Sequence, residues 1–165
     1  MSVFISYRHS DVNIAININK RLREAQIETY LDLLDAESQT TDDITSVITR
    51  NIARSTHLIA VVSSQTAQSW WVPFEIGEAT VLGRRIVSYQ NGFLNLPEYL
   101  SKWPKMQNAE HLEQFISEYR RDRLDESIAG TESYRTSDAA VRTLEKRRHA
   151  ADTFHRNLKK ILHSR

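Results

Sequence analysis

The sequence predicts one α/β domain built on a doubly wound parallel sheet. Short β-branched and aromatic runs alternate with segments of helical apolar spacing, as parallel strands joined by crossover helices require. The run over 57–63 is almost continuously apolar, which is typical of a central strand buried on both faces. The chain has 165 residues, 40% of them hydrophobic, which is enough to build one ordinary core.

The first half of the chain predicts strands and helices in alternation. Residues 3–7 are apolar, β-branched and aromatic, which predicts a buried strand, and 27–31 predicts a second one. Between them we expect a helix over 11–25, capped by Ser10 or Asp11, because isoleucine and leucine recur there at helical spacing. A second helix, capped by Asp42 or Asp43, has one apolar stripe, made of Ile44, Val47, Ile48 and Ile52.

The second half continues the alternation after the central strand. Residues 69–82 predict a helix that tolerates Pro73, because a proline in the first turn removes no helical hydrogen bond. Strands are expected at 85–89 and near 103–107, followed by a helix near 110–123.

These elements divide the chain into three parts. Residues 1–123 form the α/β domain, and 124–137 are polar and predict a connector. Residues 138–165 predict a basic C-terminal helix, which either packs on the domain or extends it.

Composition and charge exclude several classes of protein. Without cysteine there is no disulfide framework, thiolate zinc site or cysteine nucleophile. The net charge of +1 hides an asymmetry: Lys and Arg number 6 against 10 Asp and Glu over 1–82, and 16 against 11 over 83–165. No apolar run approaches the roughly 18 residues that cross a bilayer, and the start has no signal-peptide features. We therefore expect a cytoplasmic protein with no membrane partner.

Other familiar sites are missing from the sequence. The six histidines show no metal-ligand spacing, and neither a Gly-x-Gly-x-x-Gly motif nor a P-loop occurs. Ser63 and Ser64 lack a nucleophile elbow, which argues against a serine hydrolase. The basic run 145–149 is interpreted as a solvated helix face. The sequence therefore predicts no metal site and no nucleic-acid partner.

Polar and aromatic residues follow the predicted strands at the point where each strand ends. Tyr7 and Arg8 follow the first strand, Asp32 follows the second, and Trp71 and Glu75 begin the helix after the third. Ligands of open parallel sheets bind outside the carboxyl ends of the strands, at the topological switch point. We therefore expect these five residues to line one crevice.

Glu75 is the best candidate for chemistry in that crevice. We expect it within about the first turn of its helix, where the helix dipole favours an ionised carboxylate. An ionised glutamate is suited to hold sugar hydroxyls and to stabilise an oxocarbenium-like transition state. Trp71 lies four residues earlier and could stack on a cationic ring. This chemistry fits a nicotinamide riboside, whose pyridinium leaves without protonation.

Several fragments, in this order and spacing, resemble a TIR domain. The resemblance spans about residues 2–120 and includes 84–93. Its fragments are Val-Phe-Ile-Ser-Tyr-Arg at 3–8 with Asp11, Thr-Tyr-Leu-Asp at 29–32, Ser-Thr-His-Leu-Ile-Ala-Val-Val-Ser at 55–63 and Trp-Val-Pro-Phe-Glu-Ile at 71–76.

The resemblance implies a flavodoxin-like fold with a five-stranded sheet, and NAD+ glycohydrolase or ADP-ribosyl cyclase activity. By position Glu75 matches the catalytic glutamate and Trp71 its tryptophan partner, while Tyr7 and Arg8 match residues that line the nucleotide site. Asp32 begins a segment that matches the BB loop, which gates the site and joins neighbouring subunits. From Asp32 to Thr41 the chain has no glycine, lysine or arginine, a departure that bears on the loop's phosphate contacts.

A TIR protein of this size is similar to bacterial defence TIR proteins such as those of Thoeris systems. That similarity implies catalysis that depends on TIR–TIR self-association, with NAD+ as substrate rather than cofactor. The product nucleotide, whether ADP-ribose, a cyclic isomer or an amino-acid adduct, would activate a separate effector in antiphage defence. Two alternatives stay open: a non-enzymatic TIR scaffold, and a nucleoside deoxyribosyltransferase-like enzyme, which also places a glutamate at a ribose.

Overall fold

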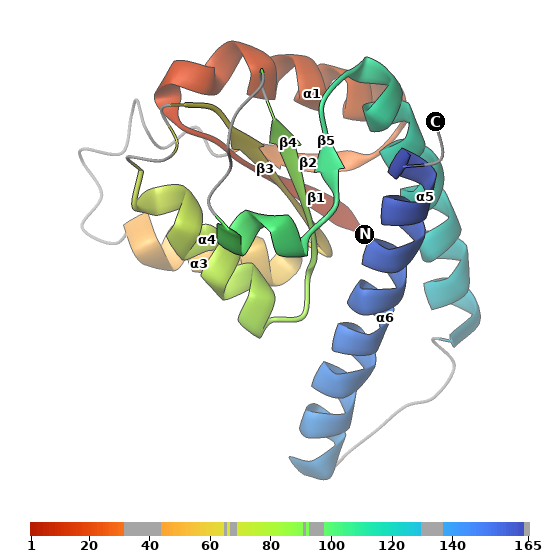
Figure 1. Ribbon diagram of the computed structural model, residues 1–165. Coiled ribbons are helices and arrows are strands. Elements are labelled where there is room, and N and C mark those ends of the chain that lie inside the picture. Colours follow the sequence, from red (N-terminus) through yellow and green to blue (C-terminus); the bar gives the residue numbers. More distant parts are fainter. Residues whose placement is uncertain are drawn as a thin grey trace.

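A parallel sheet lies between two layers of helices (Figure 1). The computed structural model describes residues 1–31, 44–64, 66, 69–90, 92, 98–129 and 137–163. Within them the sheet has five strands in the order β2-β1-β3-β4-β5, all parallel, which confirms the predicted doubly wound, flavodoxin-like architecture. The strands are β1 Ser2–Ser6, β2 Glu28–Leu31, β3 His57–Val62, β4 Arg85–Gln90 and β5 Lys105–Met106.

The helices between the strands cover both faces of the sheet. Helices α1 and α5 lie on one face, and α3 and α4 lie on the other (Figure 1). Pro73 falls in the first turn of α4, as predicted. The helices are η1 His9–Asp11, α1 Val12–Glu24, α3 Ile44–Arg54, α4 Trp71–Val81, η4 Glu98–Lys102, α5 Ala109–Ala129 and α6 Ser137–His163.

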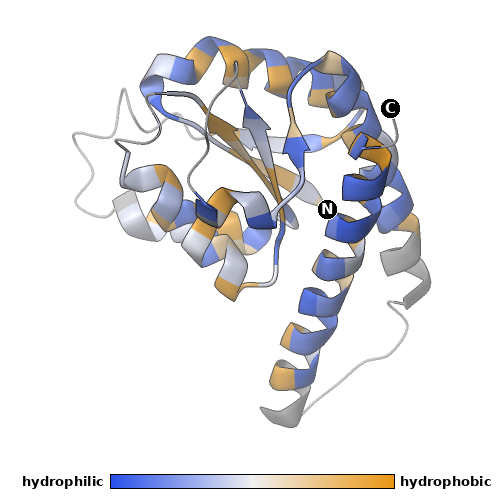
Figure 2. Ribbon diagram, in the orientation of Figure 1, coloured by the Kyte–Doolittle hydropathy of each residue, from blue (hydrophilic) through white to orange (hydrophobic). Residues whose placement is uncertain are grey.

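The two faces of the sheet form separate cores because side chains alternate along each strand. On β1, Val3 and Ile5 pack toward α1 and α5, whereas Phe4 packs toward α3 and α4. All six residues of β3 are buried, which confirms its predicted place at the centre of the sheet. Figure 2 shows hydrophobic colouring on β1 and β3 and in bands along the helices that cover the sheet, while α6 is mainly hydrophilic.

The C-terminal helix packs on the domain through a short apolar stripe. Phe154 and Leu158 are buried in the core that α1 and α5 share. His155 adds a polar contact, because its Nε2 accepts a hydrogen bond from the backbone N–H of Ile86 on β4 at 2.8 Å. Helix α5 continues to Ala129, so residues 124–129 of the predicted connector are helical.

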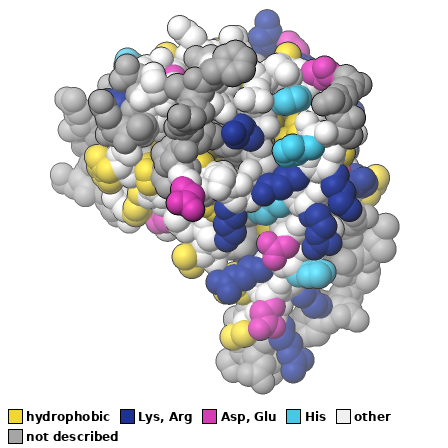
Figure 3. Space-filling model, in the orientation of Figure 1, with side chains coloured by type: hydrophobic (Ala, Val, Ile, Leu, Met, Phe, Trp, Pro, Cys, Tyr) yellow, Lys and Arg dark blue, Asp and Glu magenta, His cyan; other side chains and the backbone are white. Residues whose placement is uncertain are grey.

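The other side of α6 is strongly basic. Lys and Arg side chains gather along this helix in Figure 3. Every residue of the run 145–149 is exposed, which confirms its interpretation as a solvated helix face.

A buried polar cluster lies at the amino ends of the strands, where β3 and β4 begin. Arg85 Nε lies 2.9 Å from Asp122 Oδ2, and Arg85 Nη2 donates to Asp122 Oδ1 at 3.1 Å. His57 Nε2 is 3.5 Å from the same carboxylate. Burial, and then the charge of Arg85, hold the pKa of His57 well below its ordinary value, so this imidazole is neutral at pH 7. The cluster ties α5 to the sheet.

Candidate functional site

The candidate site lies where the order of the strands reverses. From β1 the chain passes through α1 to β2, on one side of β1. It then passes through α3 to β3, on the other side of β1. Ligands of open parallel sheets bind outside the strands' carboxyl ends at this point. Here Ser6 ends β1 and Ser63 follows β3, and each hydroxyl is hydrogen-bonded to a carboxylate from another element.

Glu75 is completely buried, at 0% exposure, against the end of β1. The Ser6 hydroxyl donates a hydrogen bond to its Oε2, although the two residues are 69 positions apart. Glu75 is the fifth residue of α4 and lies beyond the first turn, contrary to the expectation from the sequence. Because the effect of the helix dipole falls off within that turn, the Ser6 hydroxyl is the better-placed group to fix the carboxylate.

Sequence analysis missed Ser6 as part of the site. The available signal was a polar side chain in an apolar strand, two residues after Phe4 and therefore on the same face. That face packs against α4, so Ser6 is directed toward the helix that carries Glu75.

A second buried pair lies on the other face of the sheet. The Ser63 hydroxyl donates to Asp11 Oδ2 at 2.8 Å, and the backbone N–H of Ser63 donates to Thr66 Oγ1 at 2.9 Å. Asp11 occupies the N-cap position of α1, but its side chain makes no capping hydrogen bond. The predicted capping role of Asp11 is therefore wrong, because the carboxylate accepts from Ser63, the residue that follows β3, instead.

Tyr7 and Glu75 do not line the same side of the sheet. The Tyr7 side chain is buried in the core beneath α1 and α5, together with Val3 and Ile5. Glu75 lies on α4 and meets Ser6, on the opposite face. The expectation that their side chains share one hollow is not met, because consecutive residues at the end of β1 point to opposite faces.

The two tryptophans before Glu75 differ in burial. Trp71 begins α4, one helical turn before Glu75, and is partly buried against the core of the α3 and α4 face. Its ring centroid lies 5.6 Å from that of Phe74 and 4.7 Å from that of Trp70. Trp70 is 72% exposed, so only one of the adjacent indoles packs inward. Together they place aromatic surface at the start of the helix.

The remaining predicted residues have simple placements. Arg8 is partly buried and extended directly before η1, where its carbonyl accepts a hydrogen bond from the N–H of Asp11 at 2.7 Å. Asp32 lies outside the described residues. The structure therefore brings Glu75 close to the end of β1, with Trp71 on the same helix.

Two further features concern the residues that the structure describes. Among them, no three histidine, aspartate or glutamate side chains stand close enough together to hold a metal ion. None of the helices in the described ranges is both long and apolar enough to cross a bilayer.

Solved structures with this architecture include a receptor domain and an enzyme. The TIR domain of the Toll-related receptor TRR-2 from Hydra magnipapillata matches with a TM-score of 0.54 and 19% identity, covering 63% of this chain and 81% of that one. A 2-deoxyribosyltransferase from Bacillus psychrosaccharolyticus has the same TM-score at 8% identity, with coverages of 68% and 90%. At these identities the likeness shows the fold alone.

No curated protein matches the chain. A family model described as the TIR domain matches residues 3–89, which is more than half of the chain and includes Ser6 and Glu75. The matched segment runs from β1 through β4, the part of the sheet that contains the switch point. The chain therefore belongs to the TIR-domain family.

Proposed function

We propose that this TIR domain cleaves the bond between nicotinamide and ribose in NAD+, with Glu75 as its catalytic carboxylate. The observation that carries the proposal is the position of Glu75, a buried carboxylate held by Ser6 at the carboxyl end of β1. This position is beside the topological switch point, where the fold binds ligands. The resemblance of the Trp71 to Glu75 segment to NAD+-cleaving TIR domains supports the same assignment.

The chemistry requires a negative group rather than an acid. When the C1′–N bond breaks, its electron pair leaves with the ring as neutral nicotinamide, and the ribose retains the positive charge. A carboxylate beside the ribose stabilises that charge and accepts hydrogen bonds from the sugar hydroxyls. Addition of water at C1′ and loss of one proton gives ADP-ribose, whereas attack by the molecule's own adenine gives a cyclic isomer.

The proposal includes an activation step, because Ser6 and Glu75 have no exposed surface in the single chain. A substrate reaches Glu75 only after the carboxylate becomes accessible, and we assign this change to TIR–TIR assembly. Activity should then rise more steeply than in proportion to protein concentration. The product nucleotide would act on a separate effector, as in Thoeris-like antiphage defence.

The test compares the unchanged protein with Glu75→Gln and Glu118→Gln at high protein concentration with a crowding agent. Glu118 is the matched control, since it is another buried carboxylate but lies on α5. Glu75→Gln should lower nicotinamide release from NAD+ by at least about a hundredfold, and Glu118→Gln should retain it. Free nicotinamide is measured by chromatography, and circular dichroism confirms folding. Full activity of a folded Glu75→Gln protein would end the proposal.

Two other outcomes identify the alternatives. No nicotinamide from the assembled, unchanged protein would favour a scaffold that signals by self-association alone. Base release from deoxynucleosides but not from NAD+ would favour a deoxyribosyltransferase-like enzyme. The structural likeness to the Bacillus enzyme makes this second substrate worth including.

A further inference from the structure

A pocket between α3 and α4 has no part in the proposed reaction. It has a volume of about 500 Å³, and Glu75, which is completely buried, is not among its lining residues. This volume is in the range of small-molecule sites, which are mostly apolar with a few placed polar groups. The lining residues are Thr49, Pro73, Phe74, Gly77, Glu78, Val81 and Leu82.

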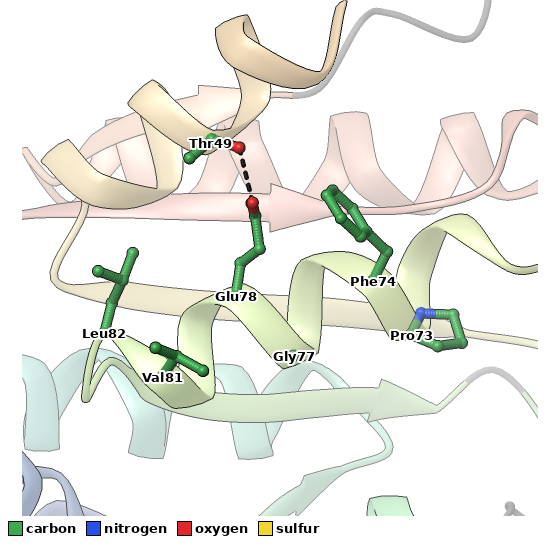
Figure 4. A pocket seen from close by; sticks show the side chains of 7 residues that line it. All are labelled: Thr49, Pro73, Phe74, Gly77, Glu78, Val81 and Leu82. Atoms are coloured by element: carbon green, nitrogen blue, oxygen red, sulfur yellow. Dashed lines mark hydrogen bonds between the residues drawn. The ribbon is translucent and has the colours of Figure 1, made fainter.

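Two rows of residues along α4 and its C-cap residue shape the pocket, each with a spacing of four residues. Glu78 points across the groove toward Thr49 on α3 (Figure 4). The first row is Phe74, Glu78 and Leu82, and the second is Pro73, Gly77 and Val81. A carboxylate therefore lies between two apolar side chains.

Gly77 leaves the hollow in the second row. A Cβ placed on Gly77 would have no heavy atom within 4 Å, and its φ is not positive, so neither packing nor backbone conformation requires glycine there. Glycine inside a helix is less favourable than alanine. The missing side chain keeps open the space between Pro73 and Val81.

Glu78 supplies the polar group of the pocket. The Thr49 hydroxyl donates to Glu78 Oε1 at 2.6 Å and so holds the carboxylate against α3. The second oxygen, Oε2, is buried and has no hydrogen-bond partner among the described residues. A buried acceptor without a donor is unfavourable, and a charged N–H donor satisfies a carboxylate most strongly.

We propose that this pocket binds a small organic cation with an aromatic or branched apolar body and one protonated amine. The two rows contact the apolar body, and the ammonium group donates a hydrogen bond to Glu78 Oε2 once the side chain turns this buried oxygen toward the pocket. Charge complementarity selects the cation over neutral and anionic molecules of the same shape. The inference goes beyond NAD+ cleavage and stands whether or not Glu75 is catalytic.

Three indole probes of matched shape test the charge requirement: tryptamine, which is cationic, tryptophol, which is neutral, and indole-3-acetate, which is anionic. Tryptamine should bind at least about tenfold more tightly than tryptophol, since hydrogen bonds to charged groups are the stronger ones. Dissociation constants come from NMR titration, in which the shifted amides should lie on α3 and α4. Equal affinity for tryptamine and tryptophol would overturn the proposal.

Variants locate the binding. Glu78→Gln should lower tryptamine affinity about tenfold and leave tryptophol affinity unchanged, while the exposed Glu28→Gln on β2, with the same charge change, should alter neither. Gly77→Leu fills the hollow and should abolish tryptamine binding. Gly77→Ala should weaken tryptamine binding by a smaller factor. If the Gly77→Leu protein does not fold, Gly77→Ala serves as the test in its place.

The remaining outcomes count against the proposal. Unchanged tryptamine affinity in Glu78→Gln or in a folded Gly77 variant would show that the cation binds elsewhere. If these variants change the sedimentation coefficient of the protein but not its affinity for tryptamine, the groove is an interface between copies of the chain.

Discussion

The buried ion pair between Arg85 and Asp122 connects β4 to α5, and its removal should strongly destabilise the fold. Asp122→Ala leaves the Arg85 guanidinium, which is only 2% exposed, without the carboxylate that lies 2.9 Å from its Nε and 3.1 Å from its Nη2. Removing one member of a buried pair costs about 3–5 kcal/mol, because the other charge stays buried. That is a large part of the roughly 5–15 kcal/mol that stabilises a typical domain.

Urea unfolding monitored by circular dichroism measures this loss. Asp122→Ala should lower the free energy of unfolding by about 3–5 kcal/mol and the melting temperature by about 6–20 °C. The Arg85→Met and Asp122→Leu double variant is the control, because it removes both charges and keeps apolar volume. It should be less destabilised than the sum of the two single changes.

The reasoning would be refuted by a small or additive effect. If Asp122→Ala costs less than about 1 kcal/mol, the value expected for an exposed pair, Arg85 is not held in a dry environment. If the double variant loses the sum of the single losses, the two side chains do not act as a pair.

Two further predictions concern the junction between α6 and β4. Burial lowers the pKa of His155 to about 4, so the unfolded chain takes up this proton first. His155 alone should therefore lower the free energy of unfolding by about 1.4 kcal/mol per pH unit from about pH 6.5 down to about pH 4. His155→Gln keeps an acceptor for Ile86 N–H but does not titrate, so its urea midpoints at pH 7 and pH 5 should differ less than those of the unchanged protein. The remaining pH dependence comes from His57, and an unchanged difference would contradict the prediction. Gly83 has a φ of +64°, and an added Cβ would lie 3.2 Å from Arg147 Cβ. Gly83→Ala should therefore lower the free energy of unfolding by about 1–2 kcal/mol and speed amide hydrogen exchange in α6. If neither quantity changes, α6 does not pack against this turn.

Much of the fold was predictable because its signals are local. The apolar run that became β3 and the helical spacing that became α3 reflect which side chains can be buried in each kind of element. The end of α5 was placed too early, because most residues from 125 on are polar and a segment without an apolar stripe gives no helical period to follow.

The candidate site was less predictable, because its contacts join distant parts of the chain. Glu75 was found from its motif, but Ser6, its hydrogen-bond donor, was not. Tyr7 was expected beside Glu75, yet it packs on the other face, since one step along the backbone reverses the direction of the side chain.

The sequence by itself determined the succession of strands and helices along the chain and the parallel sheet that this alternation requires, because periodicity depends on local burial and crossover helices join parallel strands. The order of the strands within the sheet, and with it the switch point, was decided by the tertiary structure. Only the tertiary structure decided which side chains meet across elements. Ser6 with Glu75, His155 with the backbone of β4, and the open space at Gly77 all depend on how separate elements pack, and no local pattern encodes that packing.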